Sequence, residues 1–265
     1  MQVVRNNGLT LYQFQHLSRR PEICHGITTR RGGTSLPPFD SLNMASSAGD
    51  DPGHVAVNRQ RVSAQFDAMA AVYLRQVHGR TVAVLEDGDV TDGADPFLLG
   101  EADAVVTDRP DRLLSILVAD CQAVMLYDPV RSVIANIHSG WRGSVANIIG
   151  CTVAVMQERF ACRPADILAG IGPSLGPCCA EFVNFRREIP RPLWCYQVSE
   201  NHFDFWALSR DQLVEAGLRP QHIEVGGICT RCRSDLFFSY RAAHITGRMA
   251  AVIGLRPSTR ARSPL

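Results

Sequence analysis

Short apolar runs, separated by polar and turn residues, dominate the middle of the chain. Runs of this length with β-branched and aromatic residues, bounded by Gly, Pro, Asn and Asp, are typical of β-strands. They predict strands at Ala71–Val77, Thr81–Leu85, Ala104–Thr107, Leu113–Ala119, Ala123–Tyr127 and Val133–His138. Towards the C-terminal side, similar runs predict further strands at Ile167–Ile171, Ile223–Val225, Phe237–Tyr240 and Arg248–Ile253.

Helical periodicity is limited to a few segments. Helices are predicted at Val57–Met69, at Val145–Phe160 and, more weakly, at Ser209–Ala216. Ser144 precedes the second of these and is a suitable N-cap. Because strands dominate and do not alternate regularly with helices, we predict an α/β (α+β) sandwich with a mixed β-sheet core, and not a doubly wound fold.

Length and composition favour one folded domain. The chain has 265 residues, of which 46% are hydrophobic and 20% charged, which allows a large buried core and argues against global disorder. No repeat or linker interrupts it, so we predict a single compact domain over residues 1–255. Residues 256–265 are rich in Arg, Pro and Ser, and we expect a disordered tail there.

Charge and cysteine content narrow the possible partners. The formal net charge is +1, so no global charge attracts the chain to nucleic acid or to an anionic membrane. All 27 basic residues are Arg, which excludes Schiff-base chemistry and a lysine-dependent phosphate loop. No signal peptide and no apolar stretch long enough to span a membrane is recognisable. We therefore expect a cytoplasmic protein in which most of the nine Cys are reduced.

Three predicted strands run into a reactive residue. His78, Cys121 and His138 each follow an apolar run, and strand ends are where rigid scaffolds present functional groups. A thiolate and two imidazoles suit Zn²⁺ and leave a fourth position open, while Asp120 could act beside them as a partner or base. The spacings match no short metal motif, and isolated His or Cys residues are often purely structural. Both interpretations stay open on the residues alone.

Two Gly-rich segments could bind an anion. Arg142 lies between two glycines in the segment that leads into the predicted helix, and a helix N-terminus favours an anion. Arg30 belongs to a segment of paired Arg, paired Gly and hydroxyl residues at 28–35. A phosphate site and a tight turn with a surface Arg are near-equal alternatives for the first segment. A solvated loop is the more common outcome for the second.

The remaining cysteines include a C-x-x-C at Cys229 and Cys232 and a vicinal pair at Cys178 and Cys179. Together they could form a second zinc site or a redox pair. Neither lies in a recognisable zinc ribbon or in a thioredoxin-like context. A packing or backbone role is the more common interpretation.

An ordered set of motifs resembles the laccase-domain family over nearly the whole chain. The set comprises His25-Gly26, Thr29–Ser35, Ser41-Leu42-Asn43, Gly49-Asp50-Asp51, Gln76–Gly79, Ala102–Thr107, Ala119-Asp120-Cys121, His138–Gly143, Ile171–Ser174, Cys229-Thr230, Phe237–Arg241 and Thr246-Gly247-Arg248. Each motif is short, but their order is specific. Ser139 stands where Ala is usual, and Cys179-Ala180-Glu181-Phe182 stands where Cys-Tyr-Glu-Val is usual.

The resemblance implies a fold and an activity. The family was formerly described as multicopper polyphenol oxidases. It is now understood as purine nucleoside phosphorylases with accompanying adenosine deaminase and methylthioadenosine phosphorylase activity, on an α/β sandwich likened to a toxin deamidase. It implies metal ligands at His78, Cys121 and His138. Substrate and phosphate contacts are expected at Arg142, Arg30, Asn43 and Arg241, with Zn²⁺ favoured over copper.

Other functions use the same residues in different ways. A multicopper phenol oxidase needs many His ligands, whereas this chain has eight His and no His-x-His pair. A metal-free hydrolase with Cys121 as nucleophile and a His as base is a further alternative. Nothing in the sequence marks a surface for a macromolecular partner, and a monomer or a small homo-oligomer is expected.

Overall fold

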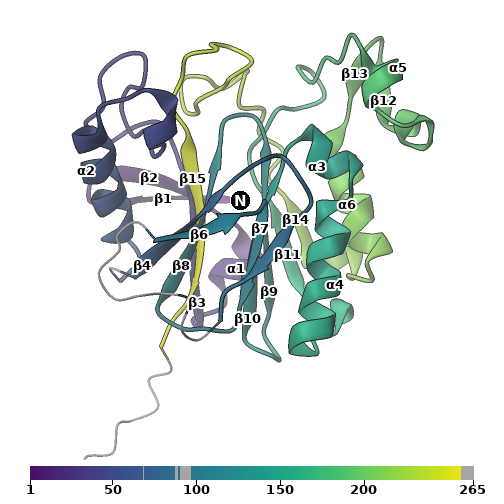
Figure 1. Ribbon diagram of the computed structural model, residues 1–265, viewed down its shortest axis with the longest axis horizontal. Helices are drawn as coiled ribbons and strands as arrows, with labels where there is room; N and C mark the ends of the chain where they lie inside the picture. The colour runs from purple at the N-terminus through teal and green to yellow at the C-terminus, as the bar shows by residue number, and fades with distance from the viewer. Residues whose placement is uncertain (68, 87–88, 90–96, 258–265) are drawn as a thin grey trace, which may run out of the picture.

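Two mixed β-sheets lie face to face at the centre of the molecule (Figure 1). The computed structural model describes residues 1–67, 69–86, 89 and 97–257. The first sheet has the order β1 (Gln2–Asn6), β2 (Leu9–Gln13), β3 (Ile23–Thr28), β15 (Met249–Leu255), β8 (Arg112–Val118), β4 (Ala70–Arg75) and β6 (Phe97–Glu101). The second has the order β14 (Ile223–Val225), β11 (Leu168–Ile171), β9 (Gln122–Asp128), β10 (Val133–Ser139), β7 (Ala104–Thr107) and β5 (Val82–Val84).

Helices cover the outer faces of this sandwich (Figure 1). The first sheet carries α2 (Pro52–Ser63), and the second carries α3 (Trp141–Val145), α4 (Ile148–Phe160) and α6 (Phe205–Glu215). The short elements are α1 (Gln15–Ser18), α5 (Phe185–Glu188), the hairpin strands β12 (Gln197–Ser199) and β13 (His202–Phe203), and the 3-10 turns Ser46–Ala48, Pro164–Asp166, Arg191–Tyr196 and Pro220–His222. Across the described part of the chain, no helix is both long enough and apolar enough to cross a membrane.

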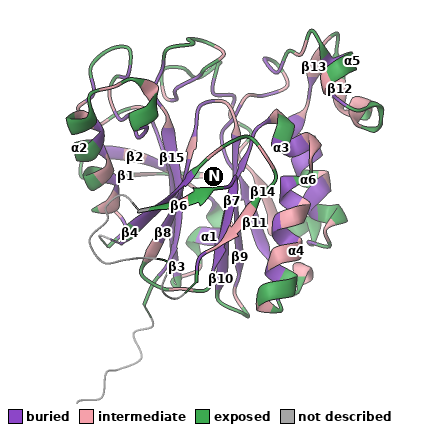
Figure 2. Ribbon diagram, viewed as in Figure 1, coloured by how far each residue is buried: buried purple, intermediate pink, exposed green. Residues whose placement is uncertain are grey.

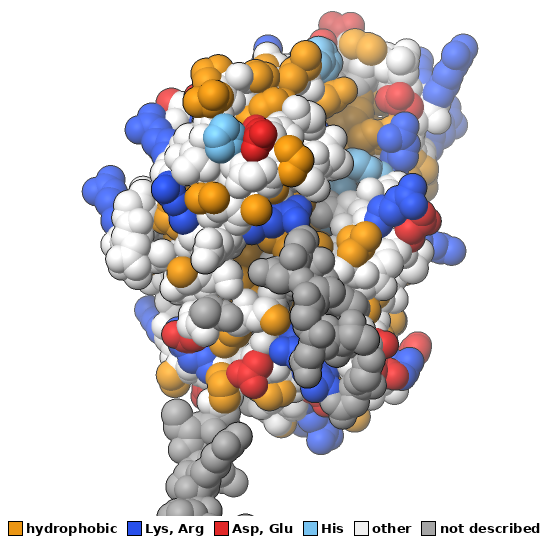
Figure 3. All heavy atoms as spheres, turned by 60° about the vertical axis from the view of Figure 1, so that its left-hand side comes forward, with side chains coloured by type: hydrophobic (Ala, Val, Ile, Leu, Met, Phe, Trp, Pro, Cys, Tyr) orange, Lys and Arg blue, Asp and Glu red, His pale blue; other side chains and the backbone are white. Residues whose placement is uncertain are grey.

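The main core lies between the two sheets, and the central strands are buried along their length, whereas the edge strands β1 and β6 are largely exposed (Figure 2). Every residue of β9, β10 and β15 is buried, because a sheet or a helix covers each face. Asn136 links the sheets: its amide donates to the Leu114 carbonyl at 2.9 Å and to the Ala251 carbonyl at 2.8 Å. On the face shown in Figure 3, acidic and basic side chains are interspersed, in keeping with the formal net charge of +1.

The predicted mixed-sheet α+β sandwich is confirmed, but several element boundaries were wrong. The first helix begins at Pro52 rather than Val57, because the Asp51 side chain accepts a hydrogen bond from the His54 N–H at 3.0 Å and caps it. The second long helix begins at Ile148. Its cap is Asn147, whose side chain accepts from the Gly150 N–H, so Ser144 is not the N-cap.

Other differences concern whole elements that the sequence pattern missed or predicted wrongly. The predicted strand at Phe237–Tyr240 is wrong: this segment is a loop whose two phenylalanines are buried in the core. Strands β1, β2, β3, β6, β12 and β13 were not predicted. Of the expected tail at 256–265, residues 258–265 lie outside the described residues.

Candidate active site and metal centre

The two sheets bring three strand ends together. His78 follows β4 of the first sheet, Cys121 lies between β8 and β9 where the chain passes from one sheet to the other, and His138 lies near the end of β10. The ligand atoms of the three side chains all lie within 4.8 Å of one another. Cys121 Sγ is 3.9 Å from His78 Nε2, and the two imidazole rings meet edge to face with centroids 4.8 Å apart. The sequence prediction that these residues converge agrees with this geometry.

Backbone features hold the three loops in this arrangement. His78 and Asp120 adopt left-handed backbone conformations, with φ of 60° and 84°. The Gln76 side chain both donates to the Leu117 carbonyl and accepts from the Leu117 N–H at 2.8 Å, which extends the pairing of β4 with β8 towards His78. A Cβ on Gly140 would lie 2.9 Å from His78 Cδ2 and 3.1 Å from Cys121 Sγ, so only glycine fits beside the two side chains.

Asp103 is a functional residue that sequence reasoning missed. It is fully buried, and its Oδ1 accepts from the His78 N–H at 2.9 Å and from His138 Nδ1 at 2.8 Å. Its Oδ2 accepts from the Gly79 N–H at 2.6 Å and from the Val77 N–H at 3.3 Å. One carboxylate therefore shapes the His78 loop and orients the His138 ring. The signals in the sequence were its place in the family motif Ala102–Thr107 and at the start of an apolar strand, neither of which shows its contacts with His78 and His138.

The same contacts set the charge of the site. Burial raises the pKa of Asp103, but the hydrogen bonds from His138, Gly79 and His78 outweigh it and leave that pKa below its ordinary value. Burial likewise opposes ionisation of Cys121, yet the charge and hydrogen bond of His138, together with His78, lower its pKa to about 6. Burial lowers the pKa of His138, but Cys121 and Asp103 reverse this and raise it to about 9. Without a bound ion, these opposite shifts favour a Cys121 thiolate beside a His138 imidazolium.

This donor set fits a zinc ion. Two imidazole nitrogens and one thiolate are common Zn²⁺ ligands, and three protein ligands leave one position open. Because ionised Asp103 can only accept, His138 Nδ1 must donate to it, and Nε2 can bind a metal once the imidazolium loses its second proton. Such a carboxylate–imidazole pair is the usual support of a metal-binding histidine.

A cavity of about 980 Å³ opens beside the three residues. Its wall includes Trp141, Phe182, Phe205 and Tyr240, which give it flat apolar surfaces. Phe182 packs against Trp141 with ring centroids 6.0 Å apart and against Phe205 at 5.2 Å. Phe182 is one of the departures from the family pattern, so that departure does alter the wall of the cavity. A volume of this size is in the upper range for small-molecule sites.

Four arginines line the cavity: Arg75, Arg142, Arg241 and Arg248. Arg75 is paired with Glu101 at 2.9 Å, so the other three are the candidates for an anion. Arg142 is exposed and lies over the Trp141 ring, 4.4 Å from its centroid. It belongs to the one-turn helix α3, and α4 begins only at Ile148, so Arg142 does not stand at the N-terminus of the long helix as predicted; its role in binding an anion stays a prediction. Arg248 was not among the predicted site residues. It is half-buried, and burial lowers the pKa of its guanidinium, partly offset by Cys121 and Asp120.

Arg241 and Asp120 connect the walls of the cavity. The Arg241 guanidinium donates to the carbonyls of Cys179 at 3.3 Å and Glu181 at 2.9 Å. Asp120 Oδ2 accepts from the backbone N–H of Arg241 at 2.6 Å, and Oδ1 accepts from the Thr230 hydroxyl at 2.6 Å. Both carboxylate oxygens of Asp120 thus have protein partners, which gives it a clear role in positioning loops. Its catalytic role as a base stays a prediction.

The structure does not bring Arg30 and Asn43 into this cavity. The Arg30 guanidinium donates to Asp40 and to the Ser234 carbonyl. The side-chain amide of Asn43 is fully buried. It donates to the Asp50 carboxylate and accepts from the backbone N–H of Arg248 at 2.9 Å. Asn43 therefore supports the loop next to Arg248 and does not line the cavity itself.

Comparisons with known proteins match almost the whole chain. The family described as "Multi-copper polyphenol oxidoreductase laccase" matches residues 24–256. Purine nucleoside phosphorylase YlmD of Geobacillus stearothermophilus is 36% identical over 245 residues, covering 87% of this chain and 89% of that protein. Purine nucleoside phosphorylase YfiH of Escherichia coli is 34% identical over 236 residues, covering 86% and 92%.

Solved structures agree with the sequence matches. The hypothetical protein YfiH of Bacillus licheniformis superposes with a TM-score of 0.83 at 33% identity, covering 95% of this chain and 97% of that one. The structure of YlmD from Geobacillus stearothermophilus gives a TM-score of 0.83 at 31% identity, covering 96% and 98%.

Proposed function

This chain belongs to the family described as multi-copper polyphenol oxidoreductase laccase, as its motifs indicated, and from that membership we propose that it is a zinc-dependent purine nucleoside phosphorylase. The names of its relatives support a nucleoside as substrate. The observation that carries the proposal is the meeting of His78, Cys121 and His138 on the wall of a cavity that also holds arginines and aromatic rings.

Phosphorolysis suits the groups that line this cavity. In the reaction the bond from the ribose C1′ to the purine nitrogen breaks and its electron pair leaves with the base. A phosphate oxygen then forms a bond with C1′, giving the free base and ribose 1-phosphate. The protein must hold a dianion, present a flat apolar surface to the base and stabilise the charge that develops on the leaving group.

Each task has candidate residues. Trp141 and Phe182 offer ring faces for the purine. Arg142 and Arg241 offer guanidinium groups for phosphate, with Arg248 next to them, and in a chain without lysine Arg is the only such cation. His78, Cys121 and His138 would hold the zinc ion, which when bound supplies a Lewis acid for the developing charge.

We include adenosine deamination as a second activity of the same site. Water replaces the amino group at C6 of the purine and ammonia leaves, so this reaction needs no phosphate. The proposed substrates of phosphorolysis are adenosine, inosine, guanosine and methylthioadenosine, whereas deamination is proposed for adenosine. Arg142 should matter less to deamination than to phosphorolysis, because only the latter binds a phosphate.

Two alternatives use the same site. For a copper-dependent polyphenol oxidase, the described residues offer one group with two histidines and a cysteine, whereas a multicopper centre needs many more His ligands. A metal-free Cys–His hydrolase is favoured by one observation, the approach of Cys121 Sγ to His78 Nε2 at 3.9 Å, with the ligand atom of His138 within 4.8 Å of both. Metal content separates this second alternative from the proposal.

The test is product analysis on purified protein of known metal content. Adenosine and inosine are each incubated with and without phosphate, and bases, ribose 1-phosphate and ammonia are measured. The proposal predicts base release that requires phosphate, with one ribose 1-phosphate for each base. Base release without phosphate would identify a hydrolase, and oxidation of a phenol without nucleoside turnover would favour the copper alternative.

A further inference from the structure

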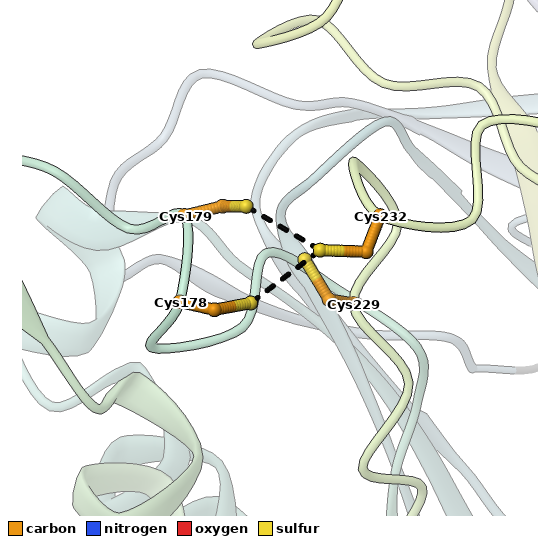
Figure 4. A group of neighbouring side chains, drawn as sticks. All are labelled: Cys178, Cys179, Cys229 and Cys232. Atoms are coloured by element: carbon orange, nitrogen blue, oxygen red, sulfur yellow. Dashed lines mark hydrogen bonds between the residues drawn. The ribbon is translucent and has the colours of Figure 1, made fainter.

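Four cysteines from two loops that are far apart in the sequence lie close together in the fold (Figure 4). Cys178 and Cys179 lie in the loop between β11 and α5, and Cys229 and Cys232 lie in the turns that follow β14. Their sulfur atoms all lie within 4.8 Å of one another. This four-cysteine cluster is separate from the centre formed by His78, Cys121 and His138.

The sulfur separations fit a single tetrahedral ion. Cys232 Sγ lies 3.6 Å from both Cys178 Sγ and Cys179 Sγ, so it is not paired with either one. With Zn–S bonds of about 2.3 Å, the edges of a tetrahedron of sulfurs measure about 3.8 Å. A disulfide would instead bring two sulfurs to about 2.05 Å and leave the other two cysteines without a role.

Backbone hydrogen bonds hold the two cysteine-bearing loops against each other. The Ser174 N–H donates to the Ile228 carbonyl at 3.1 Å, and the Thr230 N–H donates to the Ser174 carbonyl at 3.0 Å. A Cβ on Gly176 would lie 3.0 Å from Cys229 Cβ, so the close approach of the loops requires glycine there.

The types and spacing of the residues agree with this geometry. Cys229 and Cys232 have the C-x-x-C spacing of zinc-binding turns, and tetrahedral sites of four thiolates select zinc or iron. Cys179 and Cys229 are buried, while Cys178 and Cys232 are exposed. An ion could therefore enter from the surface and be held partly within the fold.

We propose that the four-cysteine cluster binds one zinc ion in a closed structural site. All four positions around the ion are filled by sulfur, so this site has no place for substrate, unlike the three-ligand centre. The inference does not depend on which reaction the cavity supports.

The ion would brace the wall of the cavity. Cys179 follows Cys178 directly, and its carbonyl accepts from the Arg241 guanidinium at 3.3 Å. Thr230 lies between Cys229 and Cys232, and its hydroxyl donates to Asp120, the neighbour of Cys121. The four-thiolate site would thus tie together the two loops that position Asp120 and Arg241.

The test is the metal content of the full chain and of two variants, measured by mass spectrometry of the elements. We expect two zinc equivalents in the wild-type protein and one in the double variant Cys229→Ser/Cys232→Ser. Cys195→Ser is the matched control, because Cys195 is another exposed free cysteine outside the cluster, and it should keep both equivalents. The double variant should also lose thermal stability relative to Cys195→Ser.

A second measurement holds even if the double variant does not fold. Cobalt-substituted wild-type protein should show the strong near-ultraviolet charge-transfer band of a four-thiolate site, in addition to the weaker band of a one-thiolate site. One zinc equivalent in the wild type, unchanged in the double variant, would overturn the proposal. Iron in the cluster, or a disulfide among these four cysteines in intact protein, would overturn it as well. If the wild-type protein holds both zinc equivalents but does not turn over nucleosides, the result counts against the proposed function and not against the four-cysteine zinc site.

Discussion

Replacing Asp103 with Asn should weaken the metal centre without touching a metal ligand. The carboxylate accepts four hydrogen bonds, two at each oxygen. The carboxamide of Asn has one oxygen that accepts and one nitrogen that donates. Whichever way it is oriented, two N–H groups meet an NH₂ group and lose their acceptor.

The two possible orientations have different costs. If the nitrogen replaces Oδ2, the N–H groups of Gly79 and Val77 lose their partner and the His78 loop is disturbed. If it replaces Oδ1, His138 Nδ1 and the His78 N–H lose theirs. A buried donor left without a partner costs about 1–3 kcal/mol, so the loss of two partners should lower the free energy of unfolding by about 2–6 kcal/mol. Zinc affinity should fall roughly 10–100-fold, the usual effect of losing such a supporting contact.

Competition with a coloured zinc chelator measures the affinity, and thermal unfolding measures the stability. Asp128→Asn is the matched control, because Asp128 is equally buried and caps two N–H groups through one oxygen, at the far end of β9 from Cys121. It should leave zinc affinity unchanged. If Asp103→Asn binds zinc as tightly as the wild type, the argument that Asp103 orients the centre is refuted.

Three further predictions concern groups around the centre. Gly140→Ala should lower zinc occupancy while the fold, followed by circular dichroism, is kept, since its Cβ would meet His78 and Cys121; full occupancy would contradict this. In metal-free protein the rate at which iodoacetamide alkylates Cys121 should rise as pH increases through about 6, the pKa at which the thiolate forms, and zinc should suppress this reaction. A pH midpoint of the alkylation rate near 9, the ordinary pKa of a cysteine thiol, would contradict this prediction. Arg142→Met should reduce phosphorolysis of inosine roughly 10²-fold and deamination of adenosine less, with the exposed Arg163→Met as control; equal losses at unchanged zinc content would assign Arg142 to the fold.

Much of the sheet core could be predicted from local pattern alone. The runs that became β7, β8, β9 and β10 are apolar because these strands are covered on both faces. By contrast, β1 is mostly exposed, and β3 carries a buried His25 whose imidazole accepts from the Phe14 N–H, so neither reads as a plain apolar run. Apolar content also misled at Phe237–Tyr240, where two rings fill the core from a loop.

The candidate site was only partly accessible from the sequence. Strand ends marked His78, Cys121 and His138, but their convergence depends on how two sheets pack, which no local pattern encodes. Asp103 and Arg248 were not predicted as site residues, because each acts through contacts with residues that are distant in the sequence. Arg30 illustrates the opposite case: a promising Gly-rich segment whose guanidinium is used by Asp40 and the Ser234 carbonyl.

We propose that the centre of His78, Cys121 and His138 holds the zinc ion on which phosphorolysis depends, a claim that zinc reconstitution can test. Protein stripped of metal is titrated with zinc while formation of ribose 1-phosphate from inosine and phosphate is followed, in the wild type and in Cys121→Ser. We predict no turnover without metal, recovery in the wild type as this centre fills, and no recovery in the variant. Phosphorolysis that persists at full rate in metal-free protein, or that zinc restores equally in Cys121→Ser, would contradict the claim.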